Sequence, residues 1–266
     1  MNNVLSFQDN LVYRAWTAAK PKVVLLAIHG IGAHSMRWNF LGAYLAQKNI
    51  STYALELRGN GDNHLSYPVY NFQKFHTDIQ EMYRIIRKKQ PKTKIVLIGE
   101  SMGGLISFNY AAHHPELDGL ICLSPAFQSL LKFRWWEYFL LPWLLILPRW
   151  PIKLHFSAQM CTADNDVQKY LSRDRRESRT VPGGLLIAIL FAQMQSAKDV
   201  EKIKIPVLFQ LAGNDVMVST AKSKEVLQKI SSAKKIITYA KMRHALSIEK
   251  NRATVFQDIL HWLEDL

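Results

Sequence analysis

The chain has 266 residues, of which 48% are hydrophobic and 21% are charged, a composition that predicts a globular protein with a packed core and excludes a low-complexity or repeat protein. Its formal net charge is +13, from 34 basic and 21 acidic residues, and such an excess favours anionic partners. The basic residues are dispersed and carry no aromatic or zinc signature of a nucleic-acid-binding module, so we expect no nucleic-acid partner.

The cysteines and the first residues of the chain bear on its compartment. Cys122 and Cys161 are the two cysteines of the chain, and two are too few for a disulfide framework. Cys122 lies in an apolar run. The opening stretch MNNVLSFQDN lacks the basic and apolar regions of a signal peptide. The sequence therefore predicts a cytoplasmic protein and leaves open a peripheral contact at the inner membrane face.

Short apolar runs alternate with helical patterns along most of the chain, which is typical of a mostly parallel sheet covered by helices. The first two strands are expected as a hairpin, 3–7 with 11–16, around Asp9 and Asn10. Continuous apolar runs predict six further buried strands, at 23–28, 51–57, 95–99, 119–124, 205–212 and 235–240. Helical periodicity is found at 71–89, from Ser101 to Pro115, at 219–230 and at 252–263.

One connection is far longer than a simple crossover between strands, since it runs from Pro125 to Lys204. We expect a helical insertion there, so the chain divides into a core part at 1–124, a cap at 125–204 and a second core part at 205–266. The insertion contains the apolar run WWEYFLLPWLLILPRWPI, which prolines interrupt. Its uncharged portion is shorter than the roughly 20 residues that cross a bilayer, so we reject a transmembrane segment.

A glycine-flanked serine stands where the strand at 95–99 gives way to a helix. The stretch 99-GESMG-103 is a G-x-S-x-G sequence, and between a strand and a helix it is typical of a nucleophile elbow. Gly99 and Gly103 leave room for a tight turn with a strained serine backbone, which lifts the hydroxyl clear of the sheet. The pattern predicts that Ser101 is a nucleophile; the alternative is an ordinary turn with an incidental serine.

A serine nucleophile needs a base, and the base needs an acid that orients it. Asp215 and His244 each directly follow a predicted strand, at the carboxyl edge where open parallel sheets bind ligands. Their order after Ser101 is the one expected for a nucleophile elbow on such a sheet. Asp199 and Glu201 precede their strand and are expected at the opposite edge. The sequence therefore predicts Ser101, Asp215 and His244 as the catalytic side chains.

Acyl transfer also requires donors for the oxyanion that develops in the transition state. One expected donor is the backbone N–H of Met102, directly after the serine. The other is expected from the loop after the first parallel strand, 29-HGIGAHSMRW-38, where glycines on both sides of Ile31 allow close backbone approach. The predicted oxyanion hole is therefore formed by the N–H groups of Ile31 and Met102.

A dinucleotide-binding loop is the alternative interpretation of the same glycines. Gly30 and Gly32 follow a strand and Glu56 closes the next one, but Ser35 stands where the third glycine belongs. That interpretation would also leave the predicted serine, aspartate and histidine unexplained. No metal-ligand cluster or phosphate-binding loop is apparent in the sequence, so we expect neither a metal nor a cofactor.

With these motifs together, the chain resembles the α/β-hydrolase superfamily and, more narrowly, its monoacylglycerol lipase and lysophospholipase group. The resemblance rests on five stretches: HGIGAHSMRW at 29–38, ELRGNGDN at 56–63, GESMGG at 99–104, GNDVMV at 213–218 and RHALSIEKN at 243–251. It implies an α/β-hydrolase fold, with an eight-stranded, mostly parallel sheet flanked by helices and a helical cap inserted after the sixth strand. It also implies the triad and oxyanion donors named above. Glu56 and Asn60 depart from the acid and the histidine usual in the second stretch.

The cap is rich in aromatic and aliphatic residues, of which Trp135, Trp143 and Leu144 are expected to contact the substrate. One interpretation is that this stripe packs on the core and lines a pocket. The other is that part of it is exposed and docks on an anionic membrane surface, with Arg149 and Lys153 meeting the headgroups. The two interpretations are compatible, because an acyl chain must leave a bilayer to reach the nucleophile.

These expectations favour a serine hydrolase that cleaves carboxylic esters with an apolar acyl chain through an acyl-enzyme, with a small lipid ester as substrate. Within the group the sequence favours a monoacylglycerol lipase, and lysophospholipase, short-chain carboxylesterase and thioesterase remain open. From a different class, a non-catalytic lipid-binding module would use the same pocket, but it would not need all three triad side chains.

Overall fold

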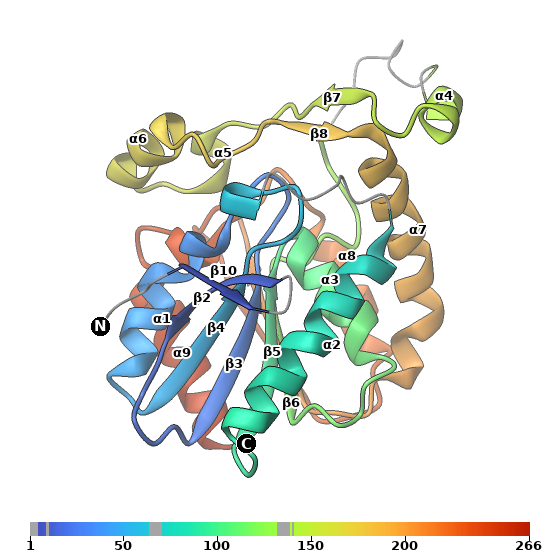
Figure 1. Ribbon diagram of the computed structural model, residues 1–266. Helices are drawn as coiled ribbons and strands as arrows, with labels where there is room; N and C mark the ends of the chain where they lie inside the picture. Colours follow the sequence, from blue (N-terminus) through green and yellow to red (C-terminus); the bar gives the residue numbers. More distant parts are fainter. Residues whose placement is uncertain (1–4, 9–10, 64–70, 132–138, 140) are drawn as a thin grey trace.

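The computed structural model describes residues 5–8, 11–63, 71–131, 139 and 141–266 (Figure 1). Its centre is an eight-stranded sheet in the order β1-β2-β4-β3-β5-β6-β9-β10. The strands are β1 (Leu5–Gln8), β2 (Leu11–Trp16), β3 (Val23–Ile28), β4 (Ile50–Leu55), β5 (Lys94–Glu100), β6 (Gly119–Leu123), β9 (Val207–Ala212) and β10 (Lys234–Tyr239). β2 runs antiparallel to β1 and β4, and the other neighbours are parallel. The predicted fold class is confirmed, with small differences at the strand ends.

Helices cover both faces of this sheet, which is why the central strand β3 is apolar and buried throughout (Figure 1). The edge strand β10 is mostly exposed and begins with Lys234 and Lys235, so the expectation of a buried strand at 235–240 was wrong. In β3, Val24 and Leu26 join the cluster under one set of helices, whereas Leu25 joins the cluster under the other. The first set contains α2 (Phe72–Lys89), α3 (Met102–Ala111) and α8 (Thr220–Gln228). The second contains α1 (Asn39–Ala46) and α9 (Arg252–Glu264). Short 3₁₀ helices are η1 (Ser35–Trp38), η2 (Gly61–Asn63), η4 (Val200–Lys202) and η5 (Leu246–Ile248).

The long connection between β6 and β9, residues 125–204, is called the cap segment below. It contains α4 (Leu141–Ile146), β7 (Pro151–Lys153), α5 (Ala158–Cys161), α6 (Asn165–Arg173), β8 (Thr180–Pro182) and α7 (Gly183–Asp199). β7 and β8 pair antiparallel, whereas the sequence predicted a helical insertion here. Both strands are three residues long and contain a proline, a residue that is depleted in strands.

The cap segment divides between two places on the molecule (Figure 1). α4, α5, α6 and the β7–β8 pair lie over one end of the sheet, whereas α7 runs back along α3. The side-chain amide of Asn109 on α3 donates a hydrogen bond to the carbonyl of Ala192 on α7, at 2.9 Å. α7 thus fixes the other cap elements to the core. None of the helices in the described ranges is long and apolar enough to cross a membrane.

Candidate active site

The predicted nucleophile stands in the turn between β5 and α3. Ser101 has φ 58° and ψ −122°, in the positive-φ region that residues other than glycine rarely adopt. Its backbone N–H donates to the carbonyl of Leu123 at 2.9 Å, and its own carbonyl accepts from Leu105 and Ala126. These bonds hold the turn in place, and the strained serine backbone expected from the sequence is present.

The two glycines of the motif are required by close approach of the backbone. A Cβ atom at Gly99 would lie 2.2 Å from the carbonyl oxygen of Gly103. A Cβ at Gly103 would lie 2.1 Å from the carbonyl oxygen of Ile28, on the neighbouring strand β3. Both separations are far inside van der Waals contact, so a larger residue at either position would force the strand and the helix apart.

The predicted acid and base meet at the edge of the sheet. Asp215 Oδ2 lies 2.8 Å from His244 Nδ1, and the two side chains are 0% and 4% exposed. The other oxygen, Oδ1, accepts the N–H groups of Met217 and Val218 at 2.8 and 3.0 Å, which fixes the carboxylate in its loop. With Nδ1–H donating to Asp215, the histidine keeps Nε2 as a proton acceptor.

The serine is not hydrogen-bonded to this pair. His244 Nε2 is buried and has no hydrogen-bond partner among the described residues. Catalytic hydrogen bonds are often long or poorly aligned in a structure without substrate, and they tighten when the complex forms. The structure therefore brings Asp215 and His244 into contact and leaves a free, buried acceptor on the imidazole.

The loop after β3 lies directly against the serine. A Cβ at Gly30 would be 3.1 Å from Ser101 Cβ and 3.6 Å from its Oγ, so only glycine fits there without a shift. Ile31 and Met102, the predicted oxyanion donors, line the same cavity as Ser101. This is the close backbone approach that the glycines of the loop predicted.

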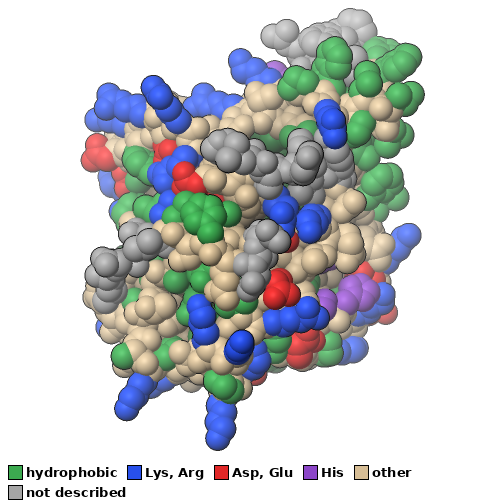
Figure 2. Space-filling view, viewed as in Figure 1, with side chains coloured by type: hydrophobic (Ala, Val, Ile, Leu, Met, Phe, Trp, Pro, Cys, Tyr) green, Lys and Arg blue, Asp and Glu red, His purple; other side chains and the backbone are tan. Residues whose placement is uncertain are grey.

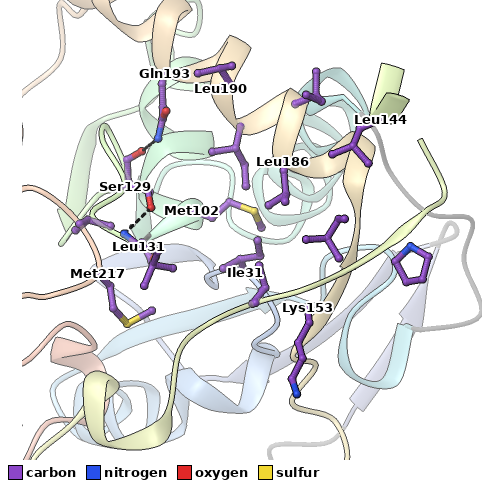
Figure 3. Close-up of a pocket in the computed structure, with 18 of the residues that line it drawn as sticks. Ile31, Met102, Ser129, Leu131, Leu144, Lys153, Leu186, Leu190, Gln193 and Met217 are labelled. Atoms are coloured by element: carbon purple, nitrogen blue, oxygen red, sulfur yellow. Dashed lines mark hydrogen bonds between the residues drawn. The ribbon is translucent and has the colours of Figure 1, made fainter. Parts of the chain in front are cut away.

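Ser101 opens into a largely apolar cavity of about 540 Å³ beneath the cap segment (Figure 3). α7 contributes Leu186 and Leu190 to its wall, and the core contributes Met217. Among the described lining residues, those with polar side chains are Ser101, Ser129, Lys153 and Gln193. Gln193 is occupied by a hydrogen bond to the carbonyl of Ala126 at 2.8 Å, and the chain of Lys153 extends away from the centre of the cavity. Such a cavity suits an apolar chain that carries a polar group at one end.

The three cap residues expected to contact the substrate are placed differently. Leu144 is 4% exposed and lines the cavity. Its neighbour Trp143 is 59% exposed and is not among the lining residues, because successive residues of α4 point in different directions. Trp135 lies outside the described residues. The structure therefore brings Leu144, but not Trp143, to the cavity.

A buried ion pair joins the loop after β3 to the cap segment, and sequence reasoning missed it. Arg37 donates two hydrogen bonds to Glu177, each at 2.7 Å, and Nε2 of His34 lies 3.2 Å from the same carboxylate. Burial alone would raise the pKa of Glu177, but the charge and hydrogen bonds of Arg37 outweigh it and lower that pKa to about 2. The backbone N–H of Ser178 also donates to the carbonyl of Gly32, at 2.8 Å. The cap thus holds the loop that carries Ile31.

Glu56, which the alternative of a dinucleotide-binding loop would assign to a ligand, has a structural role inside the protein. Its carboxylate accepts the backbone N–H groups of Ser35 and Asp62, both at 2.7 Å. The neighbouring His29 accepts the N–H of Leu57 through Nε2 at 3.0 Å, and burial lowers the pKa of His29 to about 4, so its ring is neutral at pH 7. Both oxygens of Glu56 accept backbone hydrogen bonds and connect two loops.

Fold and site define an α/β-hydrolase with a serine at the elbow. Residues 19–251 match the family model described as serine aminopeptidase, S33, and because this match covers most of the chain, the protein belongs to that family. A monoacylglycerol lipase from Paleococcus ferrophilus has the same fold, with a TM-score of 0.85 at 21% identity over 95% of this chain and 98% of that one. A soluble variant of the Saccharomyces cerevisiae monoglyceride lipase, in complex with a substrate analog, also gives 0.85, at 20% identity over 99% and 95%.

Sequence relatives belong to the same group. The monoglyceride lipase of Rattus norvegicus is 31% identical over 118 residues, which span 43% of this chain and only 39% of the rat protein. The monoacylglycerol lipase of Mycolicibacterium smegmatis is 22% identical over 270 residues, which span 95% of this chain and 92% of that protein. These comparisons support a carboxylic ester hydrolase similar to the monoglyceride lipases, and they confirm the resemblance inferred from the motifs.

Proposed function

We propose that the protein hydrolyses monoacylglycerols, with Ser101, Asp215 and His244 as a catalytic triad. The observation that carries this proposal is the buried hydrogen bond of 2.8 Å between Asp215 and His244, which leaves Nε2 of the imidazole without a partner in the described part of the chain. The strained serine at the elbow opens into an apolar cavity, so the nucleophile and the acyl-binding space adjoin each other.

The proposed reaction has two halves. In the first, Nε2 of His244 takes the proton of Ser101 as Oγ attacks the ester carbonyl carbon, and the imidazolium then gives that proton to the departing alcohol. In the second, water attacks the acyl-enzyme in the same way and releases the fatty acid. The N–H groups of Ile31 and Met102 would hold the oxyanion in both halves, and losing one such donor costs roughly 3 kcal/mol of transition-state stabilisation.

The cavity is the argument for the substrate class. Each methylene transferred from water to such a wall contributes about 0.8 kcal/mol, so a long acyl chain binds far better than an acetyl group. Among the described residues that line the cavity, Lys153 is the only one with a charged side chain, and an uncharged glycerol headgroup needs no counter-charge. The same lysine favours a lysophospholipid as the second candidate, because a headgroup phosphate at the mouth would pair with its ammonium group.

A hydrolysis profile tests this proposal. The substrates are monoacylglycerols, lysophospholipids and acyl thioesters of graded chain length, and the variant is Ser101→Ala. Ser129→Ala is the matched control, because Ser129 lines the same cavity outside the elbow. We expect Ser101→Ala to abolish hydrolysis, Ser129→Ala to retain it, and monoacylglycerols to give the highest kcat/KM. Equal rates for wild type and Ser101→Ala would refute the assigned nucleophile, and a preference for lysophospholipids would replace the substrate.

We also propose that the cap segment contacts anionic membranes. Figure 2 shows hydrophobic side chains gathered over α4, and the exposed ones include Phe139, Trp143, Leu145, Ile146 and Trp150. Exposed aromatic and aliphatic side chains can insert at the depth of the lipid headgroups. The neighbouring Arg149 and Lys153 can pair with anionic headgroups there. Flotation with anionic and neutral liposomes should show binding that Ile146→Glu weakens. No flotation with either lipid would remove this proposal.

The compartment and the domain limits are proposed on separate grounds. Cys122 and Cys161 are both free and buried, a state typical of proteins from a reducing compartment, so we propose a cytoplasmic protein with peripheral contact at the inner membrane face. We propose residues 125 and 204 as the limits of the cap, because β6 ends just before the first and β9 begins just after the second.

A further inference from the structure

A buried carboxylate links the nucleophile elbow to the loop of the histidine. Glu100 is the last residue of β5, directly before Ser101, and it is 5% exposed. Its Oε1 accepts the backbone N–H of Ser247 at 2.9 Å, and its Oε2 accepts the hydroxyl of the same serine at 2.7 Å. Ser247 is fully buried in η5, and the chain reaches it three residues after His244.

The turn itself does not require a carboxylate at this position. An apolar side chain would continue the buried strand, whereas a carboxylate must give up its hydration, and burial raises the pKa of Glu100. Both donors come from one serine, and the bonds therefore hold one loop and nothing else. The Glu100 carboxylate is buried at an energetic cost and is bonded specifically to Ser247, at the edge of the proposed site. This combination indicates a role in that site.

The charges around Glu100 point to the histidine. The titratable side chains that interact with Glu100 or lie beside its partners are His244 and Asp215, Arg37 from η1 and Cys161 from α5. Arg37 is already paired with Glu177 at 2.7 Å, which offsets its positive charge. Burial raises the pKa of Cys161 to about 11, so the thiol is neutral. The two hydrogen bonds that Ser247 donates favour the ionised form of Glu100 against its burial, and the charge of that form acts mainly on the imidazole, in addition to Asp215.

We propose that Glu100 is a positioning residue for His244: through Ser247 it fixes the histidine loop against the elbow, and its negative charge favours the imidazolium that forms when the base accepts a proton. This inference rests on the proposed triad. Asp215 orients the ring directly through Nδ1, and the backbone N–H of Ala245 donates to the carbonyl of Cys161 at 2.8 Å. Other bonds to this loop come from Asn214 and from the cap, but the bond from Glu100 begins directly beside the nucleophile.

The test is the pH dependence of kcat and kcat/KM on a water-soluble p-nitrophenyl ester, for wild type, Glu100→Gln, Glu100→Asp and Ser247→Ala. Glu100→Gln retains an oxygen for the N–H of Ser247 but loses the charge. We expect kcat to fall about tenfold with little change in KM, and the acid limb of kcat/KM to move about one unit to lower pH. Ser247→Ala retains the charge, so kcat should fall while the acid limb stays in place.

Glu100→Asp keeps the charge and is too short to reach both donors, so it should behave like Ser247→Ala. A role in folding alone would lower the activity of all three variants without moving the acid limb in Glu100→Gln, and that result would overturn the proposal. If Glu100→Gln does not fold, Glu100→Asp provides the test. Because this variant keeps the charge, a shift of its acid limb would overturn the proposal. Glu201→Gln is the matched control, because Glu201 is an exposed carboxylate. Ser101→Ala, run alongside, reports on the triad: if it is inactive while Glu100→Gln matches wild type, only the role of Glu100 fails.

Discussion

The ion pair between Arg37 and Glu177 should stabilise the folded protein at neutral pH, and Glu177→Gln should remove that contribution. The side chains of Arg37 and Glu177 are only 9% and 10% exposed, and two hydrogen bonds of 2.7 Å join them. Burial raises the pKa of Glu177, but Arg37 more than compensates and brings it from 4.5 to about 2. At 1.36 kcal/mol per pKa unit, this amounts to about 3 kcal/mol. Breaking a buried pair by removing one partner costs roughly 3–5 kcal/mol, in agreement.

The contribution depends on pH with a definite sign. Because the pKa of Glu177 is lower in the folded than in the unfolded chain, its stabilisation is fully present above about pH 4.5 and is lost as the pH falls towards 2. The glutamine of the variant does not titrate, so the difference in unfolding free energy between the two proteins must narrow in acid. At pH 3.5, about 2 of the 3 kcal/mol should remain.

Urea unfolding followed by tryptophan fluorescence at pH 7 and at pH 3.5 measures both quantities. Glu225→Gln is the matched control, because the side chain of Glu225 is 49% exposed and pairs only with lysines at the surface. It should leave the unfolding free energy almost unchanged at both pH values. A loss below about 1 kcal/mol for Glu177→Gln at pH 7, or an equal loss at both pH values, would refute the reasoning.

Three further predictions concern the site. Asp215→Asn keeps the size of the side chain, but the amide oxygen would stay with the N–H groups of Met217 and Val218 and the NH₂ group would face His244 Nδ1. Steady-state kinetics should therefore show kcat lower by about 10⁴-fold, and a loss below tenfold would contradict the assigned acid. Gly103→Ala places a methyl group 2.1 Å from the carbonyl oxygen of Ile28, so thermal unfolding should show a clearly lower Tm or no folded protein, and an unchanged Tm would contradict the close packing. Leu186→Trp fills part of the cavity, so a chain-length profile should shift to shorter esters, and an unshifted profile would place the acyl chain elsewhere.

The parts of the fold that could be predicted are those encoded locally. β3 is apolar at every position because both of its faces are covered, and its predicted bounds agree with the structure. The spacing in 99-GESMG-103 likewise predicted the strained serine, because the clashes that require glycine arise within the turn and the adjacent strand. Asp215 and His244 could be proposed because each lies in the loop that follows a strand and the carboxyl ends of parallel strands share one edge.

The parts that could not be predicted depend on partners far apart in the chain or on the rotation of one helix. Arg37 and Glu177 are 140 residues apart, and nothing in either local pattern indicates the other. Trp143 and Leu144 look alike in sequence, but only Leu144 turns toward the cavity. Glu100 did carry a signal that was overlooked: it is a charged residue at the end of an otherwise apolar run, 95-IVLIGE-100.

Covalent labelling tests the central claim most directly. A fluorophosphonate is attacked by an activated serine, loses fluoride and remains attached, so intact mass followed by peptide mapping identifies the nucleophile. For the wild type and for Ser129→Ala we predict one adduct, on the peptide that contains Ser101, and for Ser101→Ala none. An adduct on another residue, or labelling of Ser101→Ala as fast as that of wild type, would contradict the account.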